Sequence, residues 1–534
     1  MRRIKNTLAV FSVLFICYIA KAQVGINTVT PDPNAILDIS STTKGLLLPR
    51  VSLTAINLSA PLSANSAGMT VYNTATAGTK PNNVTPGYYY NNGSQWLQLA
   101  TTNMVDSKWD INGNAGTDSN IHFLGTSDNQ DLVFKRNNVL AGRLNFKNTA
   151  FGVNSLSATP GSNSTQNTAI GINVLQNNTS GYGNTGLGYG ALTNNNRNNN
   201  TAIGRYALEK NVDGFNNTGV GAYSLQENTK GTYNTAIGIS SLLKNTTGGY
   251  NTAVGYNALR NNIGNQENTA VGYGALQNNA SHNNTATGAI ALQFNTSGNY
   301  NTANGRAALN KNTSGSGNSA LGALTLINNT TGSSNTAIGR EALKNNTTGS
   351  SNIAIGYLSL ENSTSGNQNT ALGRRALKDN TVGSNNVAVG YNAQVPDGTL
   401  DNQVRIGNTN ITYAGVQVAW TITSDRRWKA GIKDSDLGLQ FIEQLRPVSY
   451  FRKNDKDEKT EYGFIAQELK ETLDENDASN NGMVAKDKNG MLAVRYNDLF
   501  SPMVKAIQEQ QVIIEQQQSA IKKLEERLDR LEKR

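Results

Sequence analysis

The chain has 534 residues and a net charge of +9, with 37% hydrophobic residues, 16% charged residues and 52 Gly. Soluble globular proteins are about half apolar and about a quarter charged, so this composition argues against several compact enzyme domains. Only two His and one Cys are present, and we expect neither a metal site nor a cofactor. The sequence has no long basic run, which argues against a nucleic-acid partner. Low charge and few Pro disfavour disorder, and abundant Asn, Thr and Gly favour a mainly β, repetitive fold.

Residues 1–22 have the features of a signal peptide. Three basic residues precede the apolar run Leu8 to Ala20, and positions 20–22 carry a small-x-small cleavage pattern. We therefore expect a secreted or cell-surface protein that begins at Gln23. Cys17 leaves with the signal, and no other run is apolar enough to predict a transmembrane segment.

Residues 23–147 are expected to form N-terminal β-rich fibre or knob modules. Within 68–98, clustered tyrosines and an Asn-Gly turn precede Trp96, which predicts hairpins with aromatic cross-strand pairs. We expect these aromatic rings to pack between strands rather than to bind sugars. The segment Gly25 to Arg50 resembles an N-terminal module of secreted bacterial fibre proteins.

Residues 148–407 repeat a short motif. It begins as NTAFG at 148–152, recurs as NTAIG or a close variant, and persists weakly as VRIG at 404–407. From the unit at 167–171 onward the step is 17 residues, or 16 in two places. A fixed period of this kind indicates a solenoid, and Gly and Asn tolerate the turns that a β-coil needs.

Each predicted coil has only about four apolar side chains, too few for one chain to build a substantial core. Stacked coils should pair strand on strand, with matching Asn and Thr residues forming ladders. Three chains around one axis could pool their apolar edges, which predicts a homotrimer. The repeats resemble those in the heads of trimeric autotransporter adhesins and in phage-like fibre shafts. The fold class expected for this region is therefore a trimeric β-solenoid or β-roll fibre.

A connector at 408–423 leads to a segment of different composition. Residues 424–534 hold 20 Lys+Arg and 21 Asp+Glu, about half of all charged residues in the chain. We expect a small α+β domain at 424–499, with helices, a strand and a hairpin turned at Asn489-Gly490.

A long helix is predicted at 500–534. Its apolar and Gln positions alternate by three and four residues from Phe500 to Leu531, which indicates a coiled-coil seam. The mixture of Ile, Gln and Leu permits a trimer but does not exclude a dimer.

The C-terminal region carries four segments that resemble the intramolecular chaperone domain of phage endosialidases and tail spikes: TSDRRWK (423–429), LRPVSY (445–450), YGFIAQE (462–468) and YNDL (496–499). That family is an auto-processing serine peptidase. The resemblance implies cleavage of the Thr423–Ser424 bond, with Ser424 as the nucleophile and Lys429 as its base. Trp428 stands where the family usually carries Leu.

The implied chemistry needs a neutral lysine. Ser424 requires a base to take its proton, and Lys429 serves only if desolvation lowers its pKa; Trp428 could help to exclude water. A spacing of five residues does not itself bring the two side chains together on a helix or a strand. The expected activity is a single self-cleavage, with no metabolic reaction.

The function expected from these features is a secreted, trimeric, adhesin-like or tail-fibre-like protein whose chaperone aligns the repeats and then removes itself. Two alternatives stay open: a trimeric adhesin that keeps its tail as a stalk, or a polysaccharide hydrolase on a fibre scaffold. A cell-surface glycan or protein is a possible ligand that the sequence does not identify.

Overall fold

The computed structural model describes residues 23–99, 113–158 and 164–533. The predicted signal peptide lies outside these residues. The chain divides into two compact units, residues 1–125 and 126–534.

The N-terminal unit contains two small sheets. Strands β1 (Val24–Ile26) and β2 (Leu37–Ile39) form a parallel pair. The second sheet has four strands in the order β3-β4-β5-β6, with the bounds Arg50–Val51, Thr70–Asn73, Gly87–Asn91 and Trp96–Gln98. The expected hairpins are confirmed, because β5 pairs antiparallel with both β4 and β6.

Aromatic packing in this sheet follows the alternation of its strands. Tyr72 and Tyr88 are cross-strand partners whose ring centroids lie 5.2 Å apart. On the opposite face, Tyr89 and Trp96 are buried with Leu53 and other apolar residues. Many apolar side chains of β1, β2 and the segment between β2 and β3 stay exposed in the single chain.

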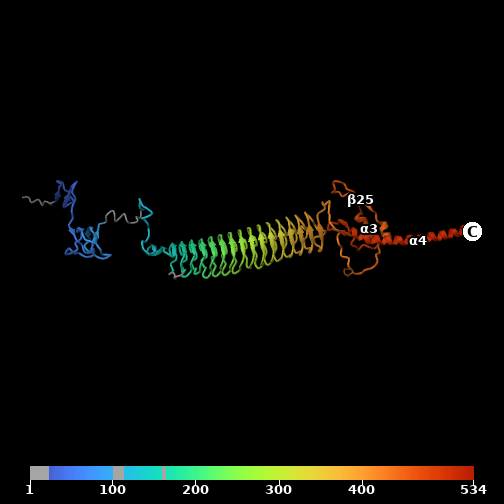
Figure 1. The fold of residues 1–534 in the computed structure, drawn as a ribbon, viewed down its shortest axis with the longest axis horizontal. Coiled ribbons are helices and arrows are strands. Elements are labelled where there is room, and N and C mark those ends of the chain that lie inside the picture. Colours follow the sequence, from blue (N-terminus) through green and yellow to red (C-terminus); the bar gives the residue numbers. More distant parts are fainter. Residues whose placement is uncertain (1–22, 100–112, 159–163, 534) are drawn as a thin grey trace, which may run out of the picture. The chain divides into compact units, whose positions relative to one another are not determined.

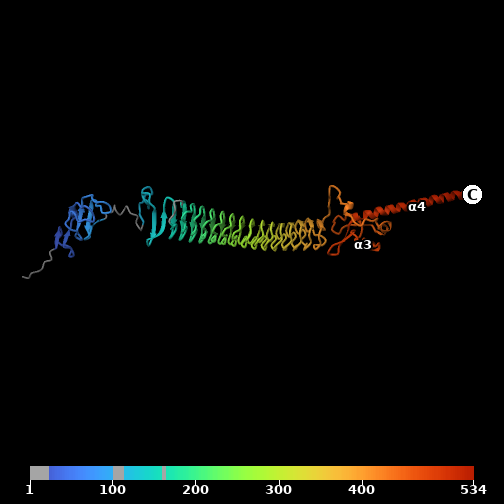
Figure 2. The same cartoon turned by 90° about the horizontal axis from the view of Figure 1, so that it is seen from below.

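The second unit begins with an open sheet that becomes a solenoid (Figures 1 and 2). Strands β7 (Leu132–Arg136) and β8 (Val139–Leu144) are antiparallel, and β8 pairs antiparallel with β9. From β9 to β24 each strand pairs in parallel with the next. The bounds of β9 to β24 are Asn148–Phe151, Asn167–Ile170, Thr185–Leu187, Thr201–Ile203, Thr218–Val220, Thr235–Ile237, Thr252–Val254, Thr269–Val271, Thr285–Thr287, Thr302–Asn304, Ser319–Leu321, Thr336–Ile338, Ile353–Ile355, Thr370–Leu372, Val387–Val389 and Val404–Ile406.

Every coil contributes one strand, which falls on the repeated motif. In β14, Ala236 is fully buried, while Ile237 on the next position is 42% exposed. The second apolar run of each coil is a turn rather than a strand, because its leucine adopts a positive φ, as at Leu242 (φ 49°) and Leu259 (φ 50°). Both leucines are fully buried, and the N–H of Leu242 donates to the carbonyl of Ala258 in the next coil at 3.0 Å.

Two columns of buried asparagines confirm the expected Asn ladders. In the column that precedes each strand, Asn251 donates its backbone N–H and its Nδ2 to Oδ1 of Asn234, at 3.0 and 3.1 Å. In the second column, Nδ2 of Asn245 donates to Oδ1 of Asn228 at 2.8 Å. Buried polar groups are costly when unpaired, so these side chains can form part of the interior only because each coil supplies partners to the next.

A glycine closes each strand. Gly238 has φ 129°, and a Cβ there would lie 2.6 Å from the carbonyl oxygen of Gly255. Any side chain would therefore push neighbouring coils apart, which explains why the fifth position of the repeat is Gly throughout.

The C-terminal part of this unit is the small α+β domain that was expected. Its elements are η1 (Arg426–Trp428), α2 (Leu439–Gln444), β25 (Val448–Tyr450), β26 (Glu461–Gly463), α3 (Ala466–Glu475), β27 (Val484–Lys486), β28 (Leu492–Val494), η2 (Tyr496–Leu499) and α4 (Phe500–Glu532). The strands form two antiparallel pairs, β25–β26 and β27–β28. A core of Leu437, Phe441, Leu469, Leu473 and Leu499 holds the domain together.

The long helix α4 begins at the predicted residue, Phe500. Among the described residues, no helix combines the length and the apolar character needed to cross a bilayer.

Candidate functional site

The structure brings Ser424 and Lys429 together. The Nζ of Lys429 donates a hydrogen bond to Oγ of Ser424 at 2.7 Å. The contact arises because the short 3-10 helix η1 folds the intervening residues into one turn. The five-residue spacing alone did not show whether the two side chains meet. The turn brings them together within one chain. The geometry is that of a nucleophile and a candidate base, while the catalytic role of both residues stays a prediction.

Asp425 organises this turn. Its Oδ1 accepts the backbone N–H of Arg427 at 2.8 Å, and its Oδ2 accepts from the Arg427 guanidinium at 2.8 Å. The side-chain hydrogen bond from Arg427, followed by the backbone one, lowers the pKa of the Asp425 carboxyl group. The N–H of Lys429 donates to the carbonyl of Arg426 at 3.1 Å, which closes the turn.

The pair lies in water in the single chain. Ser424 and Lys429 are both exposed, and Trp428 is 83% exposed, so it does not shield them there. The isolated chain therefore presents the candidate nucleophile and base in contact but open to solvent.

Exposed apolar side chains precede the candidate cleavage site. Val416, Val418, Trp420 and Ile422 alternate with smaller or polar residues and are between 57% and 79% exposed. Alternation of this kind suits a strand with one buried face, yet none of these residues belongs to a strand here. The connector thus has the pattern of a strand without a partner.

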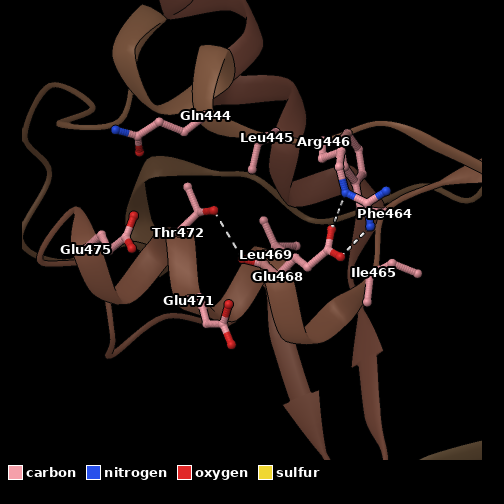
Figure 3. Close-up of a pocket in the computed structure, with 10 residues that line it drawn as sticks. All are labelled: Gln444, Leu445, Arg446, Phe464, Ile465, Glu468, Leu469, Glu471, Thr472 and Glu475. Carbon is pink, nitrogen blue, oxygen red and sulfur yellow. Dashed lines mark hydrogen bonds and ion pairs between the residues drawn. The ribbon is translucent and has the colours of Figure 1, made fainter.

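Three of the four family-like segments meet around α3. Arg446 points toward the carboxylate of Glu468 (Figure 3), and its Nε lies 3.0 Å from Oε2. The hydroxyl of Tyr496 accepts the backbone N–H of Phe464 at 3.1 Å. A hollow of about 150 Å³ lies between the end of α2 and α3, lined by residues of the segments 445–450 and 462–468 and by Glu471 and Glu475. No sequence pattern predicted the ion pair between Arg446 and Glu468, although both residues lie in segments that resemble the family.

The fourth segment, 423–429, stands apart from this cluster. Among the residues that the structure describes, no hydrogen bond or ion pair joins it to the other three segments. The described part of the chain also contains no group of three or more His, Cys, Asp or Glu that could hold a metal ion.

Two apolar surfaces of the second unit are uncovered. The third residue of most solenoid strands, such as Ile237, Val271 and Ile338, points outward and is 37–42% exposed. The predicted seam of α4 is also exposed, at Phe500, Met503, Ile507, Ile514, Ile521, Leu524, Leu528 and Leu531. The sequence predicted apolar edges but did not assign them to this position, because both Ala and Ile of the motif are apolar and the pattern alone does not say which one faces inward.

Two family models match parts of the chain. Residues 25–116 match the phage tail like trimerisation region, and residues 424–477 match Peptidase S74, described as the chaperone of endosialidase. The second match starts at Ser424 and ends before β27, so it covers less of the tail than the sequence resemblance suggested. No curated protein and no solved structure matches the chain.

Together with the β-solenoid, these matches make the chain similar to a tail-fibre protein that carries a chaperone domain. The match to a trimerisation region points to a homotrimer.

Proposed function

We propose that the protein is an exported, trimeric fibre whose C-terminal domain aligns three chains and then cuts itself off between Thr423 and Ser424. The observation that carries this proposal is the 2.7 Å contact between Lys429 Nζ and Ser424 Oγ, at the residue where the match to the endosialidase chaperone begins.

Trimerisation is supported by surfaces that one chain cannot bury. Ile237 and its equivalents form an apolar row along the parallel ladder, interrupted only at Thr287 and Asn304, because each lies opposite the same position of the next coil. Burial of apolar surface stabilises an assembly by about 25 cal/mol per Å². Three copies packed through these rows, through the α4 seam and through the exposed apolar residues of the N-terminal unit would remove all three surfaces from water.

The proposed cleavage is an acyl transfer to water. Neutral Lys429 takes the proton of the Ser424 hydroxyl as Oγ attacks the Thr423 carbonyl carbon. The C–N bond between Thr423 and Ser424 breaks, its nitrogen receives the proton from Lys429, and the acyl group is left on Oγ as an ester. Water then hydrolyses the ester, which leaves a Thr423 carboxylate and a fragment that begins with Ser424.

Assembly supplies the missing condition for this reaction. The apolar residues of the connector and Trp428 flank the Ser424–Lys429 contact and are exposed in one chain. Packing of the connectors of three chains would bury them together with Lys429. Burial lowers the pKa of a lysine because it disfavours the charged form, and it would therefore activate the base only after the trimer has formed.

The decisive experiment compares three variants of the full-length protein by denaturing gel electrophoresis and intact mass spectrometry. Wild type should give a C-terminal fragment that starts at Ser424, while Ser424→Ala should give uncut trimer and Lys429→Ala little or no fragment. Lys433→Ala is the matched control, because Lys433 lies four residues after Lys429 and pairs with Asp436 on the surface. This variant should be cut normally.

Cleavage of Ser424→Ala at the same bond would assign the cut to an outside protease and refute self-processing. Uncut wild-type trimers would instead support the adhesin that keeps its tail.

A further inference from the structure

A hollow on the surface of the solenoid lies beside one of its two 16-residue coils. The coil from Asn268 to Asn284 has 16 residues where its neighbours have 17, and the missing residue falls in the turn between Asn279 and Asn284. A hollow of about 400 Å³ lies beside this short turn. It is lined by Gln266, Glu267, His282, Asn283, Asn299 and Tyr300.

The hollow interrupts a row of aromatic rings. The position just before the ladder asparagine holds Tyr233 and Tyr250, whose rings stack 4.9 Å apart at an angle of 9°. The same position holds Glu267 and Asn283 in the next two coils, and then Tyr300. Tyr250 and Tyr300 are 58% and 68% exposed. They are separated by three coil rises, about 14 Å at the spacing of neighbouring strands.

Polar groups of the hollow are held by the backbone while their free edges face solvent. Nδ1 of His282 accepts the backbone N–H of Gln266 at 3.1 Å, so the neutral imidazole carries its proton on the opposite nitrogen, Nε2. Oδ1 of Asn299 accepts the N–H of His282 at 3.1 Å. These contacts orient an N–H donor and an amide around the space beside Tyr300.

We propose that this hollow binds a neutral, hydroxyl-rich glycan. The apolar C–H face of a sugar ring packs on an exposed aromatic face, and its hydroxyl groups pair with carboxylate, amide and imidazole groups. The lining supplies one aromatic wall, Tyr300, beside the fixed polar groups of His282 and Asn299, which is the combination that holds a sugar ring. The lining holds one carboxylate, Glu267, and no Lys or Arg, so an acidic sugar or a phosphate would meet uncompensated negative charge.

This proposal is separate from self-cleavage, because its residues lie in the shaft and not in the tail. The test uses the full-length protein on an array of immobilised neutral and sialylated glycans, with Kd values for the neutral glycans that bind. Tyr300→Ala and His282→Ala should each weaken binding by about tenfold or more, as expected for the loss of about 1.4 kcal/mol. Glu267→Gln, which keeps the shape of the side chain, should also weaken it.

The matched control is Tyr256→Ala. Tyr256 lies six residues after Tyr250 and is 50% exposed, but it stacks on Tyr273 in another column; its loss should leave the Kd unchanged. Ser424→Ala should bind like wild type, which separates this proposal from the cleavage mechanism. The proposal is refuted if no neutral glycan binds, if only sialylated glycans bind, or if Tyr300→Ala and Tyr256→Ala behave alike.

Discussion

The solenoid and the C-terminal domain obtain their order in opposite ways. In the solenoid, one set of contacts recurs from coil to coil, with a buried Ala, a buried Leu and paired Asn side chains. The C-terminal domain has a single core around Phe441 and no repeated contact. The comparison shows that the region with the most regular hydrogen bonding contains the least information about its own alignment.

The ambiguity can be seen in the strand register. Thr235 lies opposite Thr252, and Thr252 lies opposite Thr269. If one chain slipped by a whole coil against another, Thr would still face Thr and Ala would still face Ala. Register is strongly specified only where a slip exposes the wrong residues, so contacts outside the repeats must fix the alignment of three chains.

Removing the tail should therefore have the largest effect. Residues 23–423 expressed alone retain the contacts between coils but lose the α4 seam, and we expect aggregates or misaligned species instead of uniform trimers. Size-exclusion chromatography with light scattering measures the outcome. Uniform, heat-resistant trimers from this shortened chain would show that the repeats align themselves.

Breaking the α4 seam should uncouple assembly from cleavage. Ile514→Asp combined with Ile521→Asp places charges at two seam positions that are exposed in one chain, and these charges would be buried unpaired in a trimer. We expect loss of the trimer and a fall in cleavage rate of about 100-fold or more, the contribution typical of a general base.

Gln516→Asp is the control for this variant, because Gln516 is exposed and lies off the seam. Light scattering and the rate of fragment release should both stay normal in that protein. Normal cleavage in the seam variant would mean that Lys429 is activated without assembly.

Loss of one buried asparagine of the ladder should lower the free energy of unfolding by several kcal/mol. Asn234 accepts two hydrogen bonds from Asn251 and donates to Asn217 and to the carbonyl of Gly248. Asn234→Ala orphans these groups inside the coil, at a cost of about 3 kcal/mol or more. Denaturant unfolding of the shaft, followed by circular dichroism, measures this loss.

Asn177→Ala is the matched control. Asn177 also donates to an asparagine of the next coil, Asn194, at 2.8 Å, but on the exposed surface. Water replaces the lost bond there, so the change should stay within about 0.5 kcal/mol. Equal losses in the two variants would contradict the view that burial makes the ladder essential.

The smallest expected effect is a pH dependence at Glu341. The hydrogen bond from Lys344, assisted by the charges of Lys344 and Arg340, lowers the pKa of this nearly buried carboxyl group. A depressed folded-state pKa stabilises the protein above the unfolded value of about 4.3 and loses that stabilisation as the pH falls through the folded value. Unfolding midpoints of wild type and Glu341→Gln should therefore converge below pH 4, and a constant difference would exclude this linkage.

The sequence predicted the regular elements well. The fifteen-fold NTAIG-like motif placed the strands, and the alternation of three and four residues placed α4 at Phe500. Both are local patterns, and local patterns specify local structure. The same reasoning did not reveal that Ala points inward and Ile outward, because coil curvature, which the pattern does not encode, favours the smaller side chain inside.

Contacts that depend on turn conformation were beyond the sequence. Leu242 is an unlikely residue for a positive φ by intrinsic preference, and only the stacking of coils makes that conformation favourable. The meeting of Ser424 with Lys429 depends on η1, which Asp425 stabilises by capping. The hollow near Tyr300 is lined by residues of three successive coils, which lie side by side only once the coils are stacked.

The hydrogen bonding between successive coils also has a consequence for the length of the fibre. Each coil bonds to its two neighbours in the same way, as Leu242 donates to Ala258 of the following coil and Gly238 to Val220 of the preceding one, so an added coil restores the same surface that it covers. Duplication or deletion of 17 codons would change the shaft by one coil, about 4.8 Å, without a new core or a new joint at either end. The length of such a shaft can thus change during evolution in equal steps of one coil, independently of the domains at its two ends.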